Sequence, residues 1–375
     1  MSNKGEAMIP IFISAGDPSG DIAGSNLIRS LQLREKNIKF LGLGGKAMRE
    51  LGQEQIVGPD KLAVLGFWEV ALKYLFFRKL MLETVSLIEK EKPKAIILID
   101  YPGFNLRLAE RIKRLHIPII YYISPQIWAW GEGRIKQIAK LVDMMLLILP
   151  FEKDIYDKAG VKNQFVGHYL LDDIDCKYIK APYDINSHQI ALLPGSRPQE
   201  VERMMAVLIK TADILHRDKK WRFVVAGVKG KIDYSKYLAG TDAPIEIVKG
   251  RTRDIIASSR LVITSSGTAT LEIGIIGRPM VVIYKTGWIT YMLARCLVKL
   301  DKIALINITA GKKIVPELIQ AKATPENIAG EAQRILNDHE LSQQIVRELS
   351  IASDLLGPPG ASQKAAEIIR GYVNC

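Results

Sequence analysis

A loop of small polar residues at positions 265–268 lies between two apolar segments of different character. Residues 261–264 form a run typical of a β-strand, and residues 269–276 resemble a helix start. Backbone N–H groups at a helix N-terminus lack partners within the helix, and the helix dipole favours an anion beside them. We therefore expect this loop to bind a phosphate, with Glu272 one turn later accepting hydrogen bonds from a ribose. An ordinary helix start capped by Ser or Thr would show the same sequence pattern.

Three further side chains have types and positions that suit chemistry. Asp100 ends the apolar run 96–99, where a carboxylate can act as a general base if its pKa is raised, or can simply cap the following turn. Arg197 lies at the tip of a Pro-Gly-Ser turn, and its planar guanidinium suits a diphosphate, although a surface arginine is the alternative. His168 follows a glycine near a predicted domain junction and is a candidate substrate contact, a position where histidine is more often structural.

Residues 68–82 are unusually apolar for a surface helix, with eleven apolar residues in fifteen. One interpretation is an interfacial helix or a wall for acyl chains, in which Trp68, Tyr74, Phe76 and Phe77 contact lipid and the interspersed basic residues lie near head groups. The alternative is a helix buried on most sides within its own domain.

Strand-like and helix-like segments alternate along the whole chain, which is typical of a parallel sheet covered by helices on both faces. This pattern predicts an α/β protein with two Rossmann-like domains whose sheets face an interdomain cleft, and the carboxyl ends of the strands place the active site in that cleft. We expect an N-terminal domain over residues 1–170, a polar linker over 171–188 and a C-terminal domain over 189–360. A last helix, 361–375, could pack back on the N-terminal domain.

Composition favours a folded protein with an anionic partner. The chain has 375 residues, of which 48% are hydrophobic and 25% charged, and its net charge is +12. The positive charge is spread along the chain without an RNA-binding or zinc-finger pattern, so a membrane surface is favoured over nucleic acid. Three distant cysteines, no signal peptide and no apolar run of roughly 18 residues indicate a cytoplasmic protein that does not span the membrane.

Patterns for metal or covalent chemistry are missing from the sequence. It contains no His-x-x-x-His, no Asp-x-Asp suited to a metal diphosphate, no P-loop lysine and no Gly-x-Ser-x-Gly. We therefore expect neither a metal nor a cofactor, and expect helix dipoles and arginine to stabilise a leaving diphosphate. This expectation matches a transferase that uses a nucleotide-sugar donor.

Nine motifs in a fixed order resemble those of the lipid-A-disaccharide synthases over almost the full length of the chain. They are SAGDPSGD (14–21), GLGG (42–45), LIDYPGFN (98–105), SPQIWAW (124–130), LPFEKDIY (149–156), FVGH (165–168), LLPGSRPQEVERMM (192–205), SSGTATLE (265–272) and LINITAGKKIVPELIQ (305–320).

The resemblance implies a GT-B fold and an inverting, metal-independent glycosyltransferase. Its reaction would transfer 2,3-diacylglucosamine from UDP-2,3-diacylglucosamine to 2,3-diacylglucosamine 1-phosphate, giving a β-1,6 disaccharide 1-phosphate and UDP. The enzyme would be peripheral on the cytoplasmic face of the inner membrane of a Gram-negative cell, and a homo-oligomer is compatible with the sequence.

By position, the resemblance makes Asp100 the essential carboxylate and our candidate base for the acceptor hydroxyl. It implies that UDP is bound by a set of six residues: Arg197, Ser266, Gly267, Thr268, Glu272 and Asn307. It also implies that three residues line the cleft from the N-terminal side: Ser19, Gly20 and Asp21.

Two positions depart from the family pattern: Asp17 stands where Glu is usual, and Tyr169 where Pro usually follows the Gly-His pair. Two other interpretations stay open. One is another GT-B enzyme acting on a UDP-sugar, such as a peptidoglycan-type N-acetylglucosaminyltransferase or an epimerase. The other is a non-catalytic lipid- or nucleotide-binding protein, which the presence of Asp100 beside a complete UDP set argues against.

Overall fold

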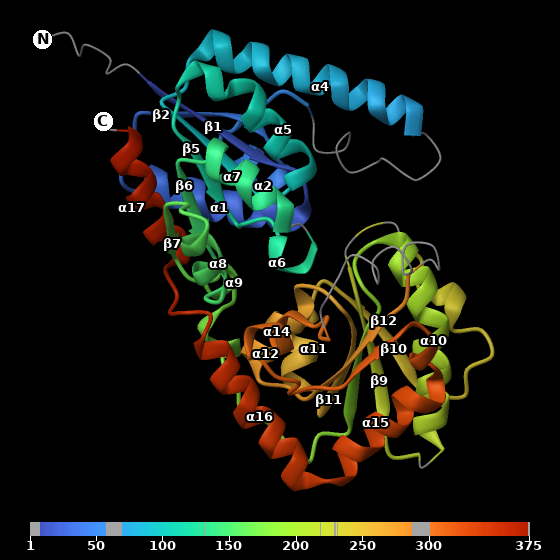
Figure 1. The fold of residues 1–375 in the computed structure, drawn as a ribbon. Coiled ribbons are helices and arrows are strands. Elements are labelled where there is room, and N and C mark those ends of the chain that lie inside the picture. The colour runs from blue at the N-terminus through green and yellow to red at the C-terminus, as the bar shows by residue number, and fades with distance from the viewer. Residues whose placement is uncertain are drawn as a thin grey trace, which may run out of the picture. The chain divides into compact units, whose positions relative to one another are not determined.

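The computed structural model describes residues 8–57, 70–130, 132–217, 219–228, 230, 232–286 and 301–373 (Figure 1). The chain divides into two compact units. The first comprises Met1–Asp173 together with Gly357–Cys375, and the second comprises Ile174–Leu356. None of the described helices is both long and apolar enough to cross a bilayer.

The first unit is built on a seven-stranded parallel sheet with the order β3-β2-β1-β4-β5-β6-β7. The central strands are continuous apolar runs, as expected where helices cover both faces of a sheet. The order reverses between β1 and β4, which is the position where open α/β sheets bind ligands. The strands are β1 (Ile9–Ala15), β2 (Ile38–Leu43), β3 (Glu54–Gln55), β4 (Ala95–Ile99), β5 (Ile119–Tyr122), β6 (Met144–Leu147) and β7 (Asn163–Phe165).

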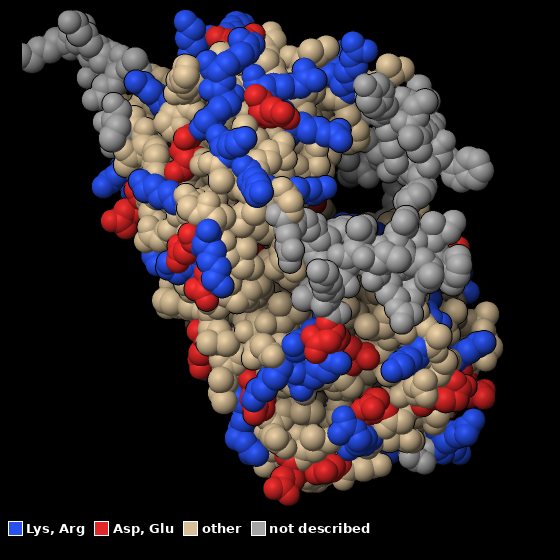
Figure 2. Space-filling model, viewed as in Figure 1, with Lys and Arg blue, Asp and Glu red and all other residues tan. Residues whose placement is uncertain are grey.

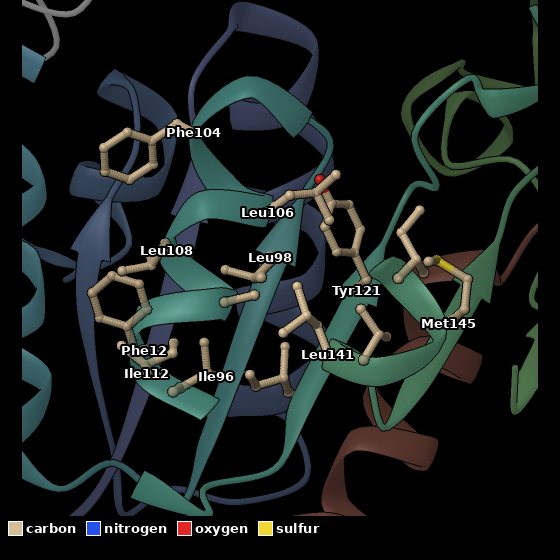
Figure 3. Close-up of a cluster of buried hydrophobic side chains, with 14 of the residues drawn as sticks. Phe12, Ile96, Leu98, Phe104, Leu106, Leu108, Ile112, Tyr121, Leu141 and Met145 are labelled. Atoms are coloured by element: carbon tan, nitrogen blue, oxygen red, sulfur yellow. The ribbon is translucent and has the colours of Figure 1, made fainter. Parts of the chain in front are cut away.

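The first unit's core lies between this sheet and its helices. One apolar cluster joins the sheet to α4, α5 and α7, and Figure 3 shows Phe12, Leu98, Leu108 and Tyr121 within it. Helices α1 and α17 contact each other and β4. The helices are α1 (Pro18–Gln32), α2 (Lys46–Glu50), α4 (Val70–Glu91), α5 (Pro102–Ile112), α6 (Ile127–Trp130), α7 (Ile135–Leu141), α8 (Glu152–Lys158), α9 (Leu170–Asp173) and α17 (Ala361–Val373).

The second unit has a six-stranded parallel sheet with the order β10-β9-β8-β11-β12-β13. Its strands are β8 (Gln189–Leu193), β9 (Arg222–Gly227), β10 (Ile245–Lys249), β11 (Leu261–Ser265), β12 (Met280–Tyr284) and β13 (Glu317–Ile319). Its α-helices are α10 (Pro198–His216), α11 (Thr252–Ser258), α12 (Ala269–Ile276), α14 (Leu305–Thr309), α15 (Pro325–Asn337) and α16 (His339–Asp354).

Helix α17 belongs to the first unit although it follows the second along the chain. The Asp172 carboxylate accepts backbone hydrogen bonds from Gly360, Ala361 and Ser362, at 2.6, 3.2 and 2.7 Å. A carboxylate at a helix N-terminus satisfies otherwise unpaired N–H groups and interacts favourably with the dipole. Asp172 therefore anchors the start of α17.

The predicted α/β class with two parallel sheets is confirmed.

Candidate functional site

Asp100 lies where the fully buried strand β4 ends, and the backbone there is strained. Asp100 and Tyr101 both have left-handed conformations, with φ of 44° and 49°. Such conformations are uncommon for residues other than glycine and concentrate at functional sites. The Tyr101 ring stacks on Phe104 and lies over Gly16, where an added Cβ would be 2.3 Å from Tyr101 Cδ1. Tight packing therefore accompanies the strained turn.

The Asp100 carboxyl is poised to accept a proton. Burial, and secondly the negative charge of Asp17, raises the pKa of Asp100 from 3.8 to about 6. A carboxylate with such a pKa is ionised at neutral pH and is a stronger base than an exposed aspartate. The raised pKa suits the predicted role of Asp100 as a general base, and that role stays a prediction.

The loop before α1 brings a second carboxylate near Asp100. Asp17 caps α1 by accepting hydrogen bonds from the Gly20 backbone N–H at 2.7 Å and from Ser19 Oγ at 2.8 Å. Ser19 and Gly20, which are predicted to line the cleft, therefore hold the Asp17 carboxylate in place. Asp21 has a different role: it accepts backbone hydrogen bonds from residues 45, 47 and 48 at 2.9–3.0 Å and so anchors the start of α2.

His168 and Tyr169 are both buried beside this region. Burial lowers the pKa of His168 to about 3, so its imidazole is neutral, and its Nδ1 accepts the Leu170 backbone N–H at 3.2 Å. Tyr169 stacks on the His168 ring, and its pKa is raised by burial and by the charge of Asp17. The structure therefore gives His168 a packing partner and a backbone contact, and its contact with substrate stays a prediction.

Glu152 is a buried carboxylate that the sequence pattern did not single out. It is 1% exposed and accepts hydrogen bonds from Ser124 Oγ, from Trp128 Nε1 at 3.2 Å and from the Leu149 backbone N–H at 3.3 Å. Burial raises the pKa of Glu152 to about 7. Glu152 thus holds the tryptophan-containing segment that follows β5. Its position in the LPFEKDIY motif was the one feature of the sequence that could have marked Glu152 as a candidate site residue.

In the second unit, two loops leave neighbouring parallel strands at the same sheet edge. Strands β8 and β11 pair with Leu193 opposite Thr264. A Cβ added at Gly195, which has φ of 106°, would lie 3.2 Å from Ser265 Oγ. The Pro-Gly-Ser turn and the small-residue loop are therefore adjacent, as a shared diphosphate site requires.

The small-residue loop has space beside its glycine and is fixed through Ser266. Among the described residues, no atom lies within 4 Å of a Cβ added at Gly267. The Ser266 hydroxyl donates to the Ile303 carbonyl at 3.1 Å, and Thr268 precedes α12 without a side-chain capping bond. Backbone N–H groups at the start of α12 can therefore donate to a phosphate oxygen.

Within the second unit, Arg197 has an acidic partner and Glu272 has a basic one. Arg197 is the exposed residue before α10, and its Nη1 lies 3.5 Å from Glu200 Oε1. Glu272 accepts a hydrogen bond from Arg253 Nε at 2.7 Å, with both side chains largely buried. The ion pair with Arg253 holds the Glu272 carboxylate in place.

Asn307 is fully buried, and its amide is saturated by the protein. Its Nδ2 donates to Val315 O and Glu317 Oε1 at 2.9 and 2.8 Å, and its Oδ1 accepts from the N–H groups of Ile314 and Val315. Glu317 in turn accepts the N–H groups of residues 303 and 304. Asn307 therefore braces the segment that the Ser266 hydroxyl contacts, rather than presenting an unpaired amide to a ligand.

Of the predicted lipid contacts, Tyr74, Phe76 and Phe77 belong to α4. Trp68 and the side chain of Tyr74 lie outside the described residues. Phe76 and Phe77 are half-buried, pack against the first unit's core and contact each other edge to face. Among the described side chains of this helix, Leu75 and Leu82 are the exposed large apolar ones, at 58% and 54%.

Basic side chains are frequent on the first unit's surface. Figure 2 shows Lys and Arg over the region of α4 and α5, with fewer Asp and Glu between them. Arg78 and Lys79 lie between the two exposed leucines of α4, one turn from each. Across the residues with described positions, no cluster of three or more His, Cys, Asp or Glu could hold a metal.

Comparison with known proteins identifies the family. A family model described as lipid-A-disaccharide synthetase matches residues 11–364. A lipid-A-disaccharide synthase of Trichlorobacter lovleyi is 38% identical over 372 residues, covering 97% of each chain. Another, of Syntrophus aciditrophicus, is 40% identical over 368 residues, covering 95% of this chain and 96% of the relative.

Solved structures share the fold at much lower identity. The S. aureus MnaA–UDP structure has a TM-score of 0.67 at 15% identity, covering 98% of this chain and 97% of that one. The UDP-GlcNAc 2-epimerase of Neisseria meningitidis bound to UDP-GlcNAc has a TM-score of 0.64 at 12% identity, covering 98% and 100%. A glycotransferase of kitacinnamycin has a TM-score of 0.62 at 13% identity, covering 98% and 100%.

The two kinds of similarity carry different weight. At 12–15% identity these solved structures show the GT-B fold alone, whereas the curated relatives match at 38–40% over nearly the entire chain. The similarity to epimerases therefore does not make the chain an epimerase. The chain belongs to the lipid-A-disaccharide synthase family of GT-B glycosyltransferases.

Proposed function

We propose that the chain transfers 2,3-diacylglucosamine from UDP-2,3-diacylglucosamine to the 6-hydroxyl of 2,3-diacylglucosamine 1-phosphate by one inverting displacement, without a metal, at the cytoplasmic face of the inner membrane. The observation that carries the mechanism is the half-buried Asp100 carboxyl on a strained turn, with its pKa raised to about 6. Family membership supports the choice of lipid substrates.

In the proposed step the Asp100 carboxylate accepts the proton of the acceptor hydroxyl. The hydroxyl oxygen forms a bond to the anomeric carbon of the donor, and the bond from that carbon to the UDP oxygen breaks on the opposite face. UDP leaves with the electron pair. A single displacement inverts the configuration at the anomeric carbon, which gives the β linkage.

Charge on the departing UDP needs stabilisation where it develops. The backbone N–H groups of residues 267–269 and Arg197 would supply hydrogen-bond donors and positive charge on one edge of the second sheet, whereas the Ser266 N–H donates to the Ile283 carbonyl at 3.0 Å. Glu272 would accept hydrogen bonds from the ribose hydroxyls, oriented by Arg253. On α4, Leu75 and Leu82 with the adjacent basic residues would contact the lipid surface.

The test measures UDP release by the purified protein in detergent. We expect release from UDP-2,3-diacylglucosamine only when 2,3-diacylglucosamine 1-phosphate is present, with an unchanged rate in EDTA and loss of release in Asp100→Asn. Turnover of a non-acylated UDP-sugar without either lipid would contradict the proposed substrates. Near-normal release by Asp100→Asn would contradict the proposed base.

A further inference from the structure

The peptide that joins Asp100 to Tyr101 is held by side chains that make no other evident contribution to the site. Its carbonyl oxygen, on Asp100, accepts a hydrogen bond from Tyr121 Oη at 2.6 Å and another from Asn105 Nδ2 at 2.8 Å. A carbonyl oxygen has two lone pairs, so both are used. The two donors come from different elements, β5 and α5.

Asn105 is itself fixed on its other side. Its Oδ1 accepts a hydrogen bond from Ser14 Oγ at 2.7 Å, and its Nδ2 also donates to Ile99 O at 3.2 Å. Ser14, Asn105 and Tyr121 are each 0% exposed. Because Ser14 donates to the amide oxygen, the amide nitrogen must face the strand-end carbonyls. The three side chains therefore form one connected buried network, which we call the carbonyl clamp.

The Tyr121 side chain of the carbonyl clamp lies within the apolar core of the first unit. Figure 3 shows the Tyr121 ring among Leu98, Leu106 and other apolar side chains of the core, with its hydroxyl at one edge of them. Placing polar groups in such a core is unfavourable unless every one is paired. Here Asn105 and Tyr121 both donate to one peptide carbonyl, that of the peptide joining the two consecutive left-handed residues, and Ser14 pairs with Asn105.

Holding this peptide controls where the carboxyl points. The plane of the 100–101 peptide sets ψ of Asp100, and a strained backbone persists only where its surroundings over-determine it. Relaxation of the turn to an ordinary conformation would rotate the Asp100 side chain away from its present direction. A displacement of about 1 Å at a reacting group can lower a rate about a hundredfold.

We propose that Ser14, Asn105 and Tyr121 are positioning residues, which clamp the Asp100 carbonyl so that the neighbouring carboxyl is aimed at the acceptor hydroxyl. The inference rests on the proposed role of Asp100 as the base. It assigns a function to three fully buried residues.

The primary test compares Tyr121→Phe with Tyr122→Phe. Both tyrosines are fully buried on β5, but of the two only Tyr121 donates its hydroxyl to the Asp100 carbonyl, whereas the Tyr122 hydroxyl lies near Ser362. We expect Tyr121→Phe to lower kcat about ten- to a hundredfold, with the KM of each lipid within about twofold of the wild type. Tyr122→Phe should retain the wild-type kcat.

Two more variants separate the possible outcomes. Ser14→Ala releases the Asn105 amide with the loss of one hydroxyl, and it should lower kcat in the same way if Tyr121→Phe fails to fold. Asp100→Asn tests the base itself. Wild-type kcat in folded Tyr121→Phe and Ser14→Ala, with Asp100→Asn inactive, would overturn the clamp and leave the base standing. Activity in Asp100→Asn would overturn both.

Discussion

Replacing Asp100 by asparagine should stabilise the folded protein while it removes activity. Burial and the charge of Asp17 raise the pKa of Asp100 from 3.8 to about 6. The folded state therefore disfavours the ionised carboxylate relative to the unfolded chain. Each pKa unit corresponds to about 1.4 kcal/mol, so the difference costs the folded state about 3 kcal/mol at pH 8. Asparagine fills nearly the same volume and carries no charge.

The sign and the pH window follow from the two pKa values. Below about pH 3.8 the carboxyl is protonated in both states, and the cost vanishes. Between pH 3.8 and about 6 the folded state binds more protons, so this contribution to the stability of the wild type falls as pH rises. The stabilisation by Asp100→Asn should therefore be about 1.5 kcal/mol at pH 5 and about 3 kcal/mol at pH 8.

The assay is urea unfolding of the wild type and Asp100→Asn at both pH values, followed by circular dichroism. In a thermal scan at pH 8 the transition of the first unit should rise by about 6–12 °C. Asp21→Asn is the matched control. Its carboxylate accepts three backbone N–H groups, so this change should destabilise by about 1–3 kcal/mol.

An Asp100→Asn variant that is destabilised or unchanged at pH 8 would refute the reasoning. Asp100 would then behave like Asp21, as a carboxylate whose charge the fold satisfies. A stabilisation equal at pH 5 and pH 8 would also refute it, because the effect would not come from ionisation.

The pH profile of kcat/KM should fall below about pH 6 with unit slope as Asp100 becomes protonated, and a flat profile from pH 5 to 8 would contradict the assignment. Glu272→Ala should raise the KM of the UDP donor about tenfold and leave the KM of the acceptor unchanged in steady-state assays. The double change Leu75→Ser and Leu82→Ser should weaken sedimentation with anionic vesicles, whereas Leu33→Ser, which alters a leucine that is 81% exposed at the end of α1, should not.

The strand ends were predictable from the sequence, and so was the location of the main candidate residues. The run 96–99 lies within β4, followed directly by Asp100, and β11 includes Ser265, the first residue of the predicted loop 265–268. Continuous apolar runs identify buried parallel strands, and parallel strands bring their carboxyl ends to one edge. These two rules are sufficient to assign Asp100 and the small-residue loop to sheet edges.

Which polar groups a side chain meets could not be predicted in the same way. Asp21 and Asn307 both look like ligand contacts in their motifs, yet their partners are backbone groups and, for Asn307, also the Glu317 carboxylate, which only the tertiary structure brings near. Glu152 shows the reverse, because hydropathy patterning does not indicate that a glutamate at the start of α8 is buried and hydrogen-bonded to Ser124 and Trp128. Periodicity reports burial of apolar faces, not hydrogen-bond partners.

Helix α4 shows a similar limit. Its apolar run has no clear periodicity, so residue type alone pointed to the aromatic residues as lipid contacts. The structure packs Phe76 and Phe77 against the core and exposes Leu75 and Leu82 instead. Contact of this helix with a membrane stays a prediction, now carried by the leucines.

The anchoring of α17 by Asp172 has a consequence for how the protein is made. The first unit begins to emerge from the ribosome long before α17, which is translated only after the whole of the second unit. Until then the surface of α1 and β4 that α17 contacts lacks its cover, and the carboxylate of Asp172 has none of its three partners on α17 or the turn before it. Completion of the first unit must therefore wait for translation of the second, so the nascent chain carries an unfinished apolar surface through most of its synthesis.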